Sequence, residues 1–371
     1  MARAIGLDIG TSSISCVVVE ESRGVIASRT VANDASSRSA RSDERLQDPV
    51  RLLDLVDDAV EWASRDHPGS AALGLTGQQH GAVYLDQALH PVSPLITWQD
   101  GRGWRLFNHP AGPSDRERNA ADTDHSFVGQ LEDVTGYHMA SGYGLTTHFV
   151  LLHAGAVPAG ASCLATIADL AVARLAGLDR PVCHPSMAAS LGLYDLPGQR
   201  FDLKALANAK IDPAILPTVS NNERPLGEYR GLAIVPAIGD NQASYLGAAG
   251  MAGGLLINIG TGSQISLTSG ATIRTVDGLE TRPHVAGNYL LVGSALCGGA
   301  AYRQLCDFFA ACAGLAGARV DGPDLYEAAT QAALAAMTAA NGPAPLRVDT
   351  RFQGTRTDPD RRGTISGIGP D

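Results

Sequence analysis

The sequence predicts an α/β fold built from two domains, and three observations lead to this prediction. The chain has 371 residues, which is enough for about two domains with a buried core each. Short apolar runs with strand character alternate with stretches whose apolar residues have helical spacing. One pattern also occurs twice: GLDIGTSSIS begins at Gly6 and LINIGTGSQIS begins at Leu256, and each is an apolar run that breaks into Gly-Thr.

The first part of the chain is predicted to run strand, strand, strand, helix, strand. Strands are expected at residues 4–9, 14–19 and 25–30, where turn residues separate the apolar runs. Apolar residues at helical spacing predict a helix over 48–65, and Asp48-Pro49 is a typical helix start. The stretch AALGLTGQQHG is the next strand and runs into a polar loop. Ser36 to Arg45 is predicted to be a solvated loop, although its arginines would also suit contact with a phosphate.

The rest of the chain contains one place where the opening pattern begins again. Helices are expected around 126–134, 145–155 and 164–175, and GLYDLPGQRFD is a turn-rich connection. From Gly231 a strand, a polar turn and a hairpin follow, so we place a domain boundary near residue 230. Helices near 298–313 and 324–340, the loop NGPAP and a strand LRVDTRF complete the prediction.

Composition excludes several classes of function. A net charge of −10 argues against a general nucleic-acid binder, which would need a basic surface to neutralise phosphates. No apolar run is long enough to span a membrane, and the N-terminus lacks a signal-peptide pattern, so a cytoplasmic protein is expected. The six cysteines have no CxxC spacing, which favours buried free thiols over disulfides or a zinc site.

The paired Gly-Thr turns are suited to hold a polyphosphate. Such a turn presents backbone N–H groups and hydroxyls with little side-chain bulk, so an anionic oxygen can approach closely. Neither turn is a Walker loop, because the two lysines, Lys204 and Lys210, do not follow a glycine-rich turn. Asp8 would repel a bare triphosphate, and a bound Mg²⁺ would remove that repulsion. For one such turn alone, an ordinary hairpin is the better interpretation.

Two further groups of residues are candidates for catalysis and for ligand binding. In VPAIGDNQAS, Asp240 stands where a strand gives way to a polar loop, so it is a candidate to take the proton of an acceptor hydroxyl; capping of the next segment is the alternative. The loops TGQQHG, ITWQDGR and SGYG carry amides, an imidazole, a carboxylate and flat rings, which suit a polyhydroxylated ligand. These residues are Gln78, Gln79, His80, Trp98, Gln99, Asp100, Arg102 and Tyr143.

The order DIGTSS, TGQQHG, TWQDGR, GDNQAS, NIGTGS and RFQGTRTDPDRRG resembles that of the FGGY carbohydrate kinases. These are ATP-dependent sugar kinases with a two-lobed, actin-like (ribonuclease H-like) α/β fold. The resemblance spans essentially the whole chain in consistent order. WQDGR and GDNQAS are fairly specific to the family, whereas the Gly-Thr turns are shared by the actin-like superfamily.

The resemblance implies a role for each matching residue. Residues 1–230 would form the sugar-binding lobe and residues 231–371 a partial nucleotide-binding lobe. Asp240 would be the general base, and the sugar-binding residues would be Gln79, His80, Trp98, Asp100, Tyr143 and Asn241. The first phosphate turn would consist of Asp8, Gly10, Thr11 and Ser12, with Asp8 linked indirectly to Mg²⁺. Gly260, Thr261 and Gly262 would form the second turn, and Gly299 in CGGAAYR would lie beside the nucleotide.

The implied activity is transfer of the γ-phosphate of MgATP to a terminal hydroxyl of a ketose. Sedoheptulose is favoured, because GQQHGAVYLD, SGYGLTTHF and CHPSMAASLGLY look most like the corresponding stretches of family members that act on that sugar; xylulose or another ketose or polyol is the alternative.

The resemblance also implies that the second lobe is incomplete, because relatives continue past GTRTDPDRRG with a Gly-Gly motif that holds the adenine. Cys297 and Ala300 also depart from the asparagine common near that turn. Two other classes stay open: an inactive sugar-binding remnant, and an actin-like ATPase, which WQDGR and the histidine loop disfavour. A homodimer is left open.

Overall fold

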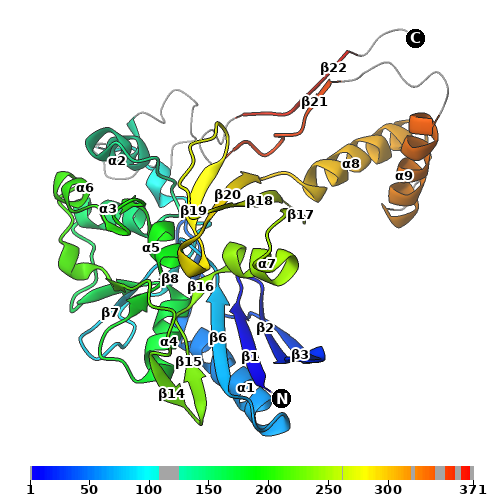
Figure 1. The fold of residues 1–371 in the computed structure, drawn as a ribbon. Coiled ribbons are helices and arrows are strands. Elements are labelled where there is room, and N and C mark those ends of the chain that lie inside the picture. The colour runs from blue at the N-terminus through cyan, green and yellow to red at the C-terminus, as the bar shows by residue number, and fades with distance from the viewer. Residues whose placement is uncertain are drawn as a thin grey trace. The chain divides into compact units, whose positions relative to one another are not determined.

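The computed structural model describes residues 2–107, 125–260, 262–318, 322–338, 347–355 and 361–367. The described chain falls into two compact units (Figure 1). The first contains residues 1–254, 268–275 and 281–291, and the second contains residues 255–267, 276–280 and 292–371. The boundary expected near residue 230 lies within the first unit, and the division into a sugar lobe and a nucleotide lobe stays a prediction.

A mixed sheet forms the centre of the first unit. Its strand order is β14-β15-β6-β1-β2-β3, with β16 also paired to β6. β1 is antiparallel to β2 and parallel to β6, and β6 is parallel to β15. The strands are β1 (Arg3–Ile9), β2 (Ser13–Glu20), β3 (Gly24–Ala32), β6 (Ala72–Gly77), β14 (Gly227–Tyr229), β15 (Leu232–Ile234) and β16 (Ile238–Gly239). The three strands expected at the start of the chain are therefore confirmed.

Two helices cover one face of this sheet. α1 (Pro49–Asp66) packs on β1 and β2, and α4 (Ile167–Ala176) packs on β6 and against α1. The alternation along β1 turns Ile5, Leu7 and Ile9 into the core. α1 begins where the sequence predicts, since Asp48 accepts hydrogen bonds from the N–H groups of Val50 and Arg51, a cap that contributes about 1 kcal/mol.

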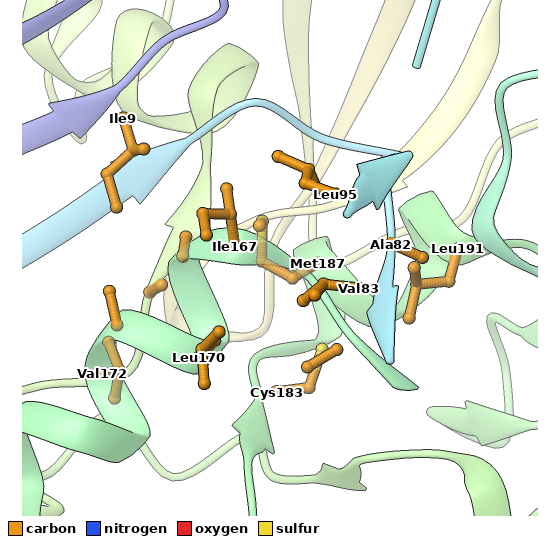
Figure 2. Close-up of a cluster of buried hydrophobic side chains, with 14 of the residues drawn as sticks. Ile9, Ala82, Val83, Leu95, Ile167, Leu170, Val172, Cys183, Met187 and Leu191 are labelled. Carbon is orange, nitrogen blue, oxygen red and sulfur yellow. The ribbon is translucent and has the colours of Figure 1, made fainter. Parts of the chain in front are cut away.

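The first unit also contains further helices and short strands outside this sheet. Figure 2 shows part of the core of this unit, where Val83 of β7, Leu170 of α4 and Met187 of α5 belong to one buried cluster. The helices are α2 (Phe127–Thr135), α3 (Gly144–His153), α5 (Pro185–Leu191), α6 (Leu203–Asn208) and α7 (Asp240–Ala249), with short 3₁₀ turns η1 (Arg102–Trp104), η3 (Pro213–Ile215) and η4 (Val285–Gly287). β4 (Ser36–Ser37), β5 (Leu46–Gln47) and β8 (Leu95–Ile96) form a three-stranded sheet. The remaining short strands form pairs: β7 (Val83–Leu85) with β9 (Cys163–Ala165), β10 (Val182–Cys183) with β13 (Thr218–Val219), and β11 (Tyr194–Asp195) with β12 (Arg200–Phe201).

The expected helices of the middle region are present with small shifts at their ends. The prediction for 164–175 begins too early, because residues 163–165 form β9 and Thr166 caps α4 by accepting from the Asp169 N–H. GLYDLPGQRFD is confirmed as a turn-rich connection and contains the β11–β12 hairpin.

The second unit contains β17 (Leu255–Ile259), parts of three further strands and two helices. β17 and β18 (Ser263–Gly270) form the expected hairpin, in a sheet ordered β17-β18-β20-β19 that includes β19 (Glu280–Pro283) and β20 (Tyr289–Ala295). Residues 268–270, 281–283 and 289–291 of these strands belong to the first unit. The two predicted helices are α8 (Gly299–Leu315) and α9 (Gly322–Thr338). The strand predicted for LRVDTRF is shorter, β21 (Arg347–Asp349), and pairs with β22 (Thr364–Ser366). The loop NGPAP lies outside the described residues.

Two expectations from composition are addressed by the structure. All six cysteines are free, as predicted, and five of them are buried; Cys312 is exposed. None of the described helices combines the length and the apolar character that a membrane span requires.

Candidate active site

The Gly-Thr turn after β1 is tightly closed. The Gly10 N–H donates to the Ser13 carbonyl at 3.0 Å, and a Cβ at Gly10 would lie 2.8 Å from that oxygen, so a larger residue does not fit. Asn33 donates to the carbonyls of Gly10 and Thr11 at 2.9 and 3.1 Å, and Gln47 donates to the Thr11 carbonyl at 3.0 Å. Because these amides engage carbonyl oxygens that would repel an anion, the turn is better suited to a phosphate.

A chain of hydrogen bonds connects this turn to the WQDGR loop. The Thr11 hydroxyl accepts from Trp98 Nε1 at 2.9 Å and donates to Gln78 Oε1 at 3.5 Å. Gln78 in turn donates to Gln47 Oε1 at 2.8 Å. The structure therefore brings a predicted phosphate residue and a predicted sugar residue into direct contact. The sequence did not indicate Asn33 and Gln47 as site residues, because they belong to no motif. Their role follows from their position beside the turn, whose carbonyls they bind.

Asp8 and Asp240 lie at the same end of the sheet, where Asp8 is part of β1 and Asp240 directly follows β16, and both strands pair with β6. Asp8 of β1 is paired with Thr76 of β6, while Ile238 and Gly239 of β16 pair with Thr76 and Gly77 from the other side. Asp240 follows as the first residue of α7. Gly239 is the N-cap of α7 and no side chain caps this helix, so the capping alternative for Asp240 is not supported. Asp240 Oδ1 accepts from the N–H of the neighbouring Asn241 at 2.7 Å.

The environment of Asp8 favours a cation. Its Oδ1 is buried and has no hydrogen-bond partner among the described residues. Burial, and secondly the charge of Asp240, raises the pKa of Asp8 to about 6. A buried carboxylate with an unpartnered oxygen near a second carboxylate is the kind of donor set that Mg²⁺ prefers, so these two residues fit a divalent ion. Among the described residues, no group of three or more His, Cys, Asp or Glu side chains that could hold a metal ion is present, so this candidate site consists of two carboxylates only.

The histidine loop is held by α5. The His80 ring stacks on Tyr143 with centroids 4.5 Å apart and planes 3° apart. His80 Nδ1 lies 2.8 Å from the Ser190 carbonyl, which can only accept, so Nδ1 carries a proton. When the ring is neutral, Nε2 is therefore an acceptor. The backbone of His80 has a positive φ of 71°, a strained conformation of the kind found at functional sites. The His80 N–H donates to the Ser190 hydroxyl at 3.1 Å and helps to hold it.

Ser186 of the same helix links Gln79 to the strand that precedes Asp240. Gln79 Nε2 donates to the Ser186 carbonyl at 3.0 Å, and the Gly239 N–H donates to the Ser186 hydroxyl at 3.1 Å. The two serines, four residues apart in CHPSMAASLGLY, were not chosen as site residues, although their helical spacing was a signal that both face one side.

Asp100 is placed differently from the other predicted sugar residues. It is 1% exposed, and its carboxylate accepts from Arg102 Nε at 2.7 Å, Arg102 Nη2 at 3.1 Å and the Arg45 N–H at 2.9 Å. These bonds engage both oxygens in holding the WQDGR loop. Asn241 is buried in the first turn of α7. The roles of both residues in sugar binding stay predictions.

The residues predicted for the second phosphate turn meet within the second unit. The Gly260 N–H donates to the Gly262 carbonyl at 2.9 Å, and the Gly299 N–H donates to the Gly260 carbonyl at 2.7 Å. A Cβ at Gly299 would lie 2.9 Å from that carbonyl, so the start of α8 packs directly on the turn. Thr261 lies outside the described residues.

Comparison with known proteins identifies the class to which this fold and site belong. The structure of a xylulose kinase from Rhodospirillum rubrum superposes with a TM-score of 0.78 at 21% identity, covering 99% of this chain and 73% of that one. A xylulose kinase from Brucella ovis gives a TM-score of 0.77 at 20% identity, over 100% of this chain and 73% of that one. The fold is thus the predicted actin-like (ribonuclease H-like) α/β fold of sugar kinases.

The family follows from the sequence match. Residues 3–247 match the N-terminal domain of the FGGY family of carbohydrate kinases, and the chain belongs to this family. It is 24% identical to the sedoheptulokinase of Mus musculus over 335 residues, which is 80% of this chain and 66% of that protein. It is 25% identical to the xylulose kinase of Streptomyces rubiginosus, over 70% of this chain and 53% of that protein. The chain thus spans about two thirds or less of the length of these relatives.

Proposed function

We propose that this protein transfers the γ-phosphate of MgATP to a terminal primary hydroxyl of a ketose. The observation that carries the proposal is that Asp8, in β1 beside the Gly-Thr turn, and Asp240, directly after β16, lie at the same end of the sheet and close enough for their charges to interact. Phosphoryl transfer depends on positioning and charge stabilisation, and it needs a carboxylate that can take the proton of the acceptor hydroxyl. Membership of the FGGY family supports the same class of reaction.

The residues of the first unit have four roles. Asp240 takes the proton of the acceptor hydroxyl and orients its oxygen, while the Gly10–Ser13 turn receives the phosphate. Asp8 would hold Mg²⁺, directly or through water, and the ion would neutralise charge on the polyphosphate. His80, with Nε2 as an acceptor and its ring against Tyr143, and Gln79, held by Ser186, are placed to bind sugar hydroxyls.

Sedoheptulose is our first choice of acceptor, giving sedoheptulose 7-phosphate, and xylulose is the second. Both names come from relatives that are 24–26% identical. Ketoses differ by one carbon and the orientation of a few hydroxyls, and recognition of a hydroxyl discriminates more strongly than recognition of a methylene. The polar, hydrogen-bonded loops around His80 and Trp98 are therefore where the choice of sugar is made.

The test is ADP release by the purified chain with MgATP and, in turn, no sugar, sedoheptulose, D-xylulose and glycerol. We expect strong stimulation by sedoheptulose, which would establish both the activity and the acceptor. Stimulation by D-xylulose or glycerol alone would retain the kinase and change the acceptor. A folded sample that binds a sugar by calorimetry but releases no ADP with any acceptor would contradict the proposal and favour a sugar-binding protein without catalysis.

A further inference from the structure

A cavity adjoins the phosphate turn, and its lining residues differ from those of the candidate site around Asp8. It has a volume of about 630 Å³, within the range of small-molecule sites, and it is lined by the loop between β4 and β5. Hydroxyl and amide groups dominate its wall, among them those of Asn33, Ser37, Ser39, Ser42, Thr97 and Gln99. Asp8, Asp240, Gln79 and His80 do not line it, whereas Thr11 and Ser12 do. We call it the loop pocket.

The wall of the loop pocket is fixed by contacts with distant parts of the chain. Arg105 donates to Asp43 at 2.7 and 3.1 Å and to Glu44 at 2.7 Å. The Ser39 hydroxyl donates to Glu44 Oε2 at 2.6 Å, and the Thr97 N–H donates to the Arg45 carbonyl at 3.0 Å. The segment predicted to be a solvated loop is therefore a preformed surface, which reduces the entropy lost when a ligand binds.

One positive charge in this wall is not compensated. Burial alone would raise the pKa of Glu44, but hydrogen bonds from Arg105 and Ser39 and the charge of Arg102 hold it below its usual value, so this carboxylate is already engaged. Arg41 lies 3.5 Å from Asp43. The side chain of Arg45 donates from Nη1 to the carbonyls of Ser42 and Glu44, at 2.6 and 2.8 Å. It forms no ion pair with a carboxylate within the described part of the chain.

Thr97 provides an independent indication of a ligand. It is 1% exposed, it lines the loop pocket, and its hydroxyl has no hydrogen-bond partner in the portion of the chain that the structure describes. A buried hydroxyl without a partner costs free energy, and a bound hydroxylated molecule would recover that cost.

We propose that the loop pocket binds a phosphorylated sugar, with the phosphate at Arg45 and sugar hydroxyls on the serine, threonine and amide groups. A fixed guanidinium with free donors is suited to a phosphate, and groups that both donate and accept are suited to a polyol. The inference does not depend on the proposed kinase activity, because it concerns binding to a pocket that the catalytic carboxylates do not line.

Calorimetric titration without ATP tests the proposal, using sedoheptulose 7-phosphate, sedoheptulose and inorganic phosphate as probes. Arg45→Gln removes the charge and retains the backbone bonds that hold the loop, and Arg38→Gln is the matched control, because Arg38 is exposed on the same loop and does not line the pocket. We expect the sugar phosphate to bind the unaltered chain, Arg45→Gln to weaken it roughly tenfold or more, and Arg38→Gln to change it little. Thr97→Val, which keeps the side-chain shape, should weaken it severalfold.

Three results would overturn the proposal. Equal binding of sedoheptulose 7-phosphate by Arg45→Gln and the unaltered chain would place the ligand elsewhere, such as beside Asp240. Absence of binding to the unaltered chain would show that the pocket does not take this class of ligand. Inorganic phosphate binding as tightly as the sugar phosphate would remove the sugar from the proposal. Each result is obtained without ATP, so it is independent of whether ADP release is observed.

Discussion

Asp8 is the residue for which burial and function are most closely connected. Its carboxylate is placed in the sheet with one unpartnered oxygen, and burial followed by the charge of Asp240 raises its pKa to about 6. A folded protein tolerates such a group poorly unless a proton or a cation accompanies it. The same position therefore costs stability in the free protein, and under the proposed function it would provide affinity for a divalent ion.

Asp240→Asn is expected to reduce turnover by about 10²–10⁴-fold while sugar binding changes less than about threefold. The amide oxygen can still accept from the Asn241 N–H, so the start of α7 should be retained. ADP release and calorimetric titration with sedoheptulose measure the two effects. Asp54→Asn, on the exposed surface of α1, is the control for the loss of one carboxylate. Retained turnover in Asp240→Asn would exclude Asp240 as the general base.

At the scale of elements, the sequence predicted the helices and strands whose ends are set by residues close by in the chain. Asp48 and the helical spacing after it define α1, and the strands from residue 4 to 30 were recognised from short apolar runs separated by turn residues. The loop from Ser36 to Arg45 was not recognised, because its order depends on Arg105 and Asp100, which are more than fifty residues away along the chain.

The same limit applies to the site. Asp240, His80 and Trp98 stand in motifs, so the sequence indicated them. Ser186 and Ser190 act by holding Gln79 and His80 across a separation of more than a hundred residues, and such pairings are set by packing rather than by a local pattern.

Gly239→Ala tests how closely α7 is coupled to the histidine loop. A Cβ there would lie 2.1 Å from Gln79 Nε2 and 2.4 Å from Gln242 Oε1, while φ at Gly239 is −64°, so crowding rather than backbone strain is the cost. We expect a loss of about 1–3 kcal/mol in the free energy of unfolding and roughly tenfold weaker sedoheptulose binding. Urea denaturation and calorimetry measure these quantities.

The control for this change lies on the same helix. Gly247 is exposed in α7, and a Cβ there would meet no atom within 4 Å. Gly247→Ala should therefore stabilise the protein by about 0.5–1 kcal/mol and leave sugar binding unchanged. If Gly239→Ala behaved like Gly247→Ala, the contact between Gln79 and the start of α7 would have no part in binding.

At the scale of the whole molecule, the first unit buries titratable groups with opposite responses to pH. Burial lowers the pKa of His148 to about 4, and it lowers that of His184 to about 4 and that of His284 as well. Burial also raises the pKa of Asp169 to about 7. The histidines are neutral in the folded protein at neutral pH, and Asp169 holds its proton more strongly folded than unfolded.

The signs of the two effects follow from the protons that each state binds. As pH falls below about 6.5, an unfolded histidine takes a proton that the buried one refuses, so the stability contributed by His148 is complete above 6.5 and is lost towards pH 4. For Asp169 the folded state binds the proton first, so its contribution grows as pH falls from about 7 to 3.8.

Two substitutions separate these contributions. The free energy of unfolding should decrease between pH 7 and pH 5, and in His148→Gln this decrease should be smaller by about 1–2 kcal/mol. The glutamine can still form a hydrogen bond with the Tyr84 hydroxyl, which lies 2.8 Å from His148 Nδ1. In Asp169→Asn the decrease in the free energy of unfolding should be larger by a similar amount. The asparagine can still accept a hydrogen bond from the Thr166 hydroxyl. Urea denaturation at the two pH values, followed by tryptophan fluorescence, reports the first unit, since Trp62, Trp98 and Trp104 all lie in it. Shifts of the same sign in both variants would show that these groups do not titrate as their burial requires.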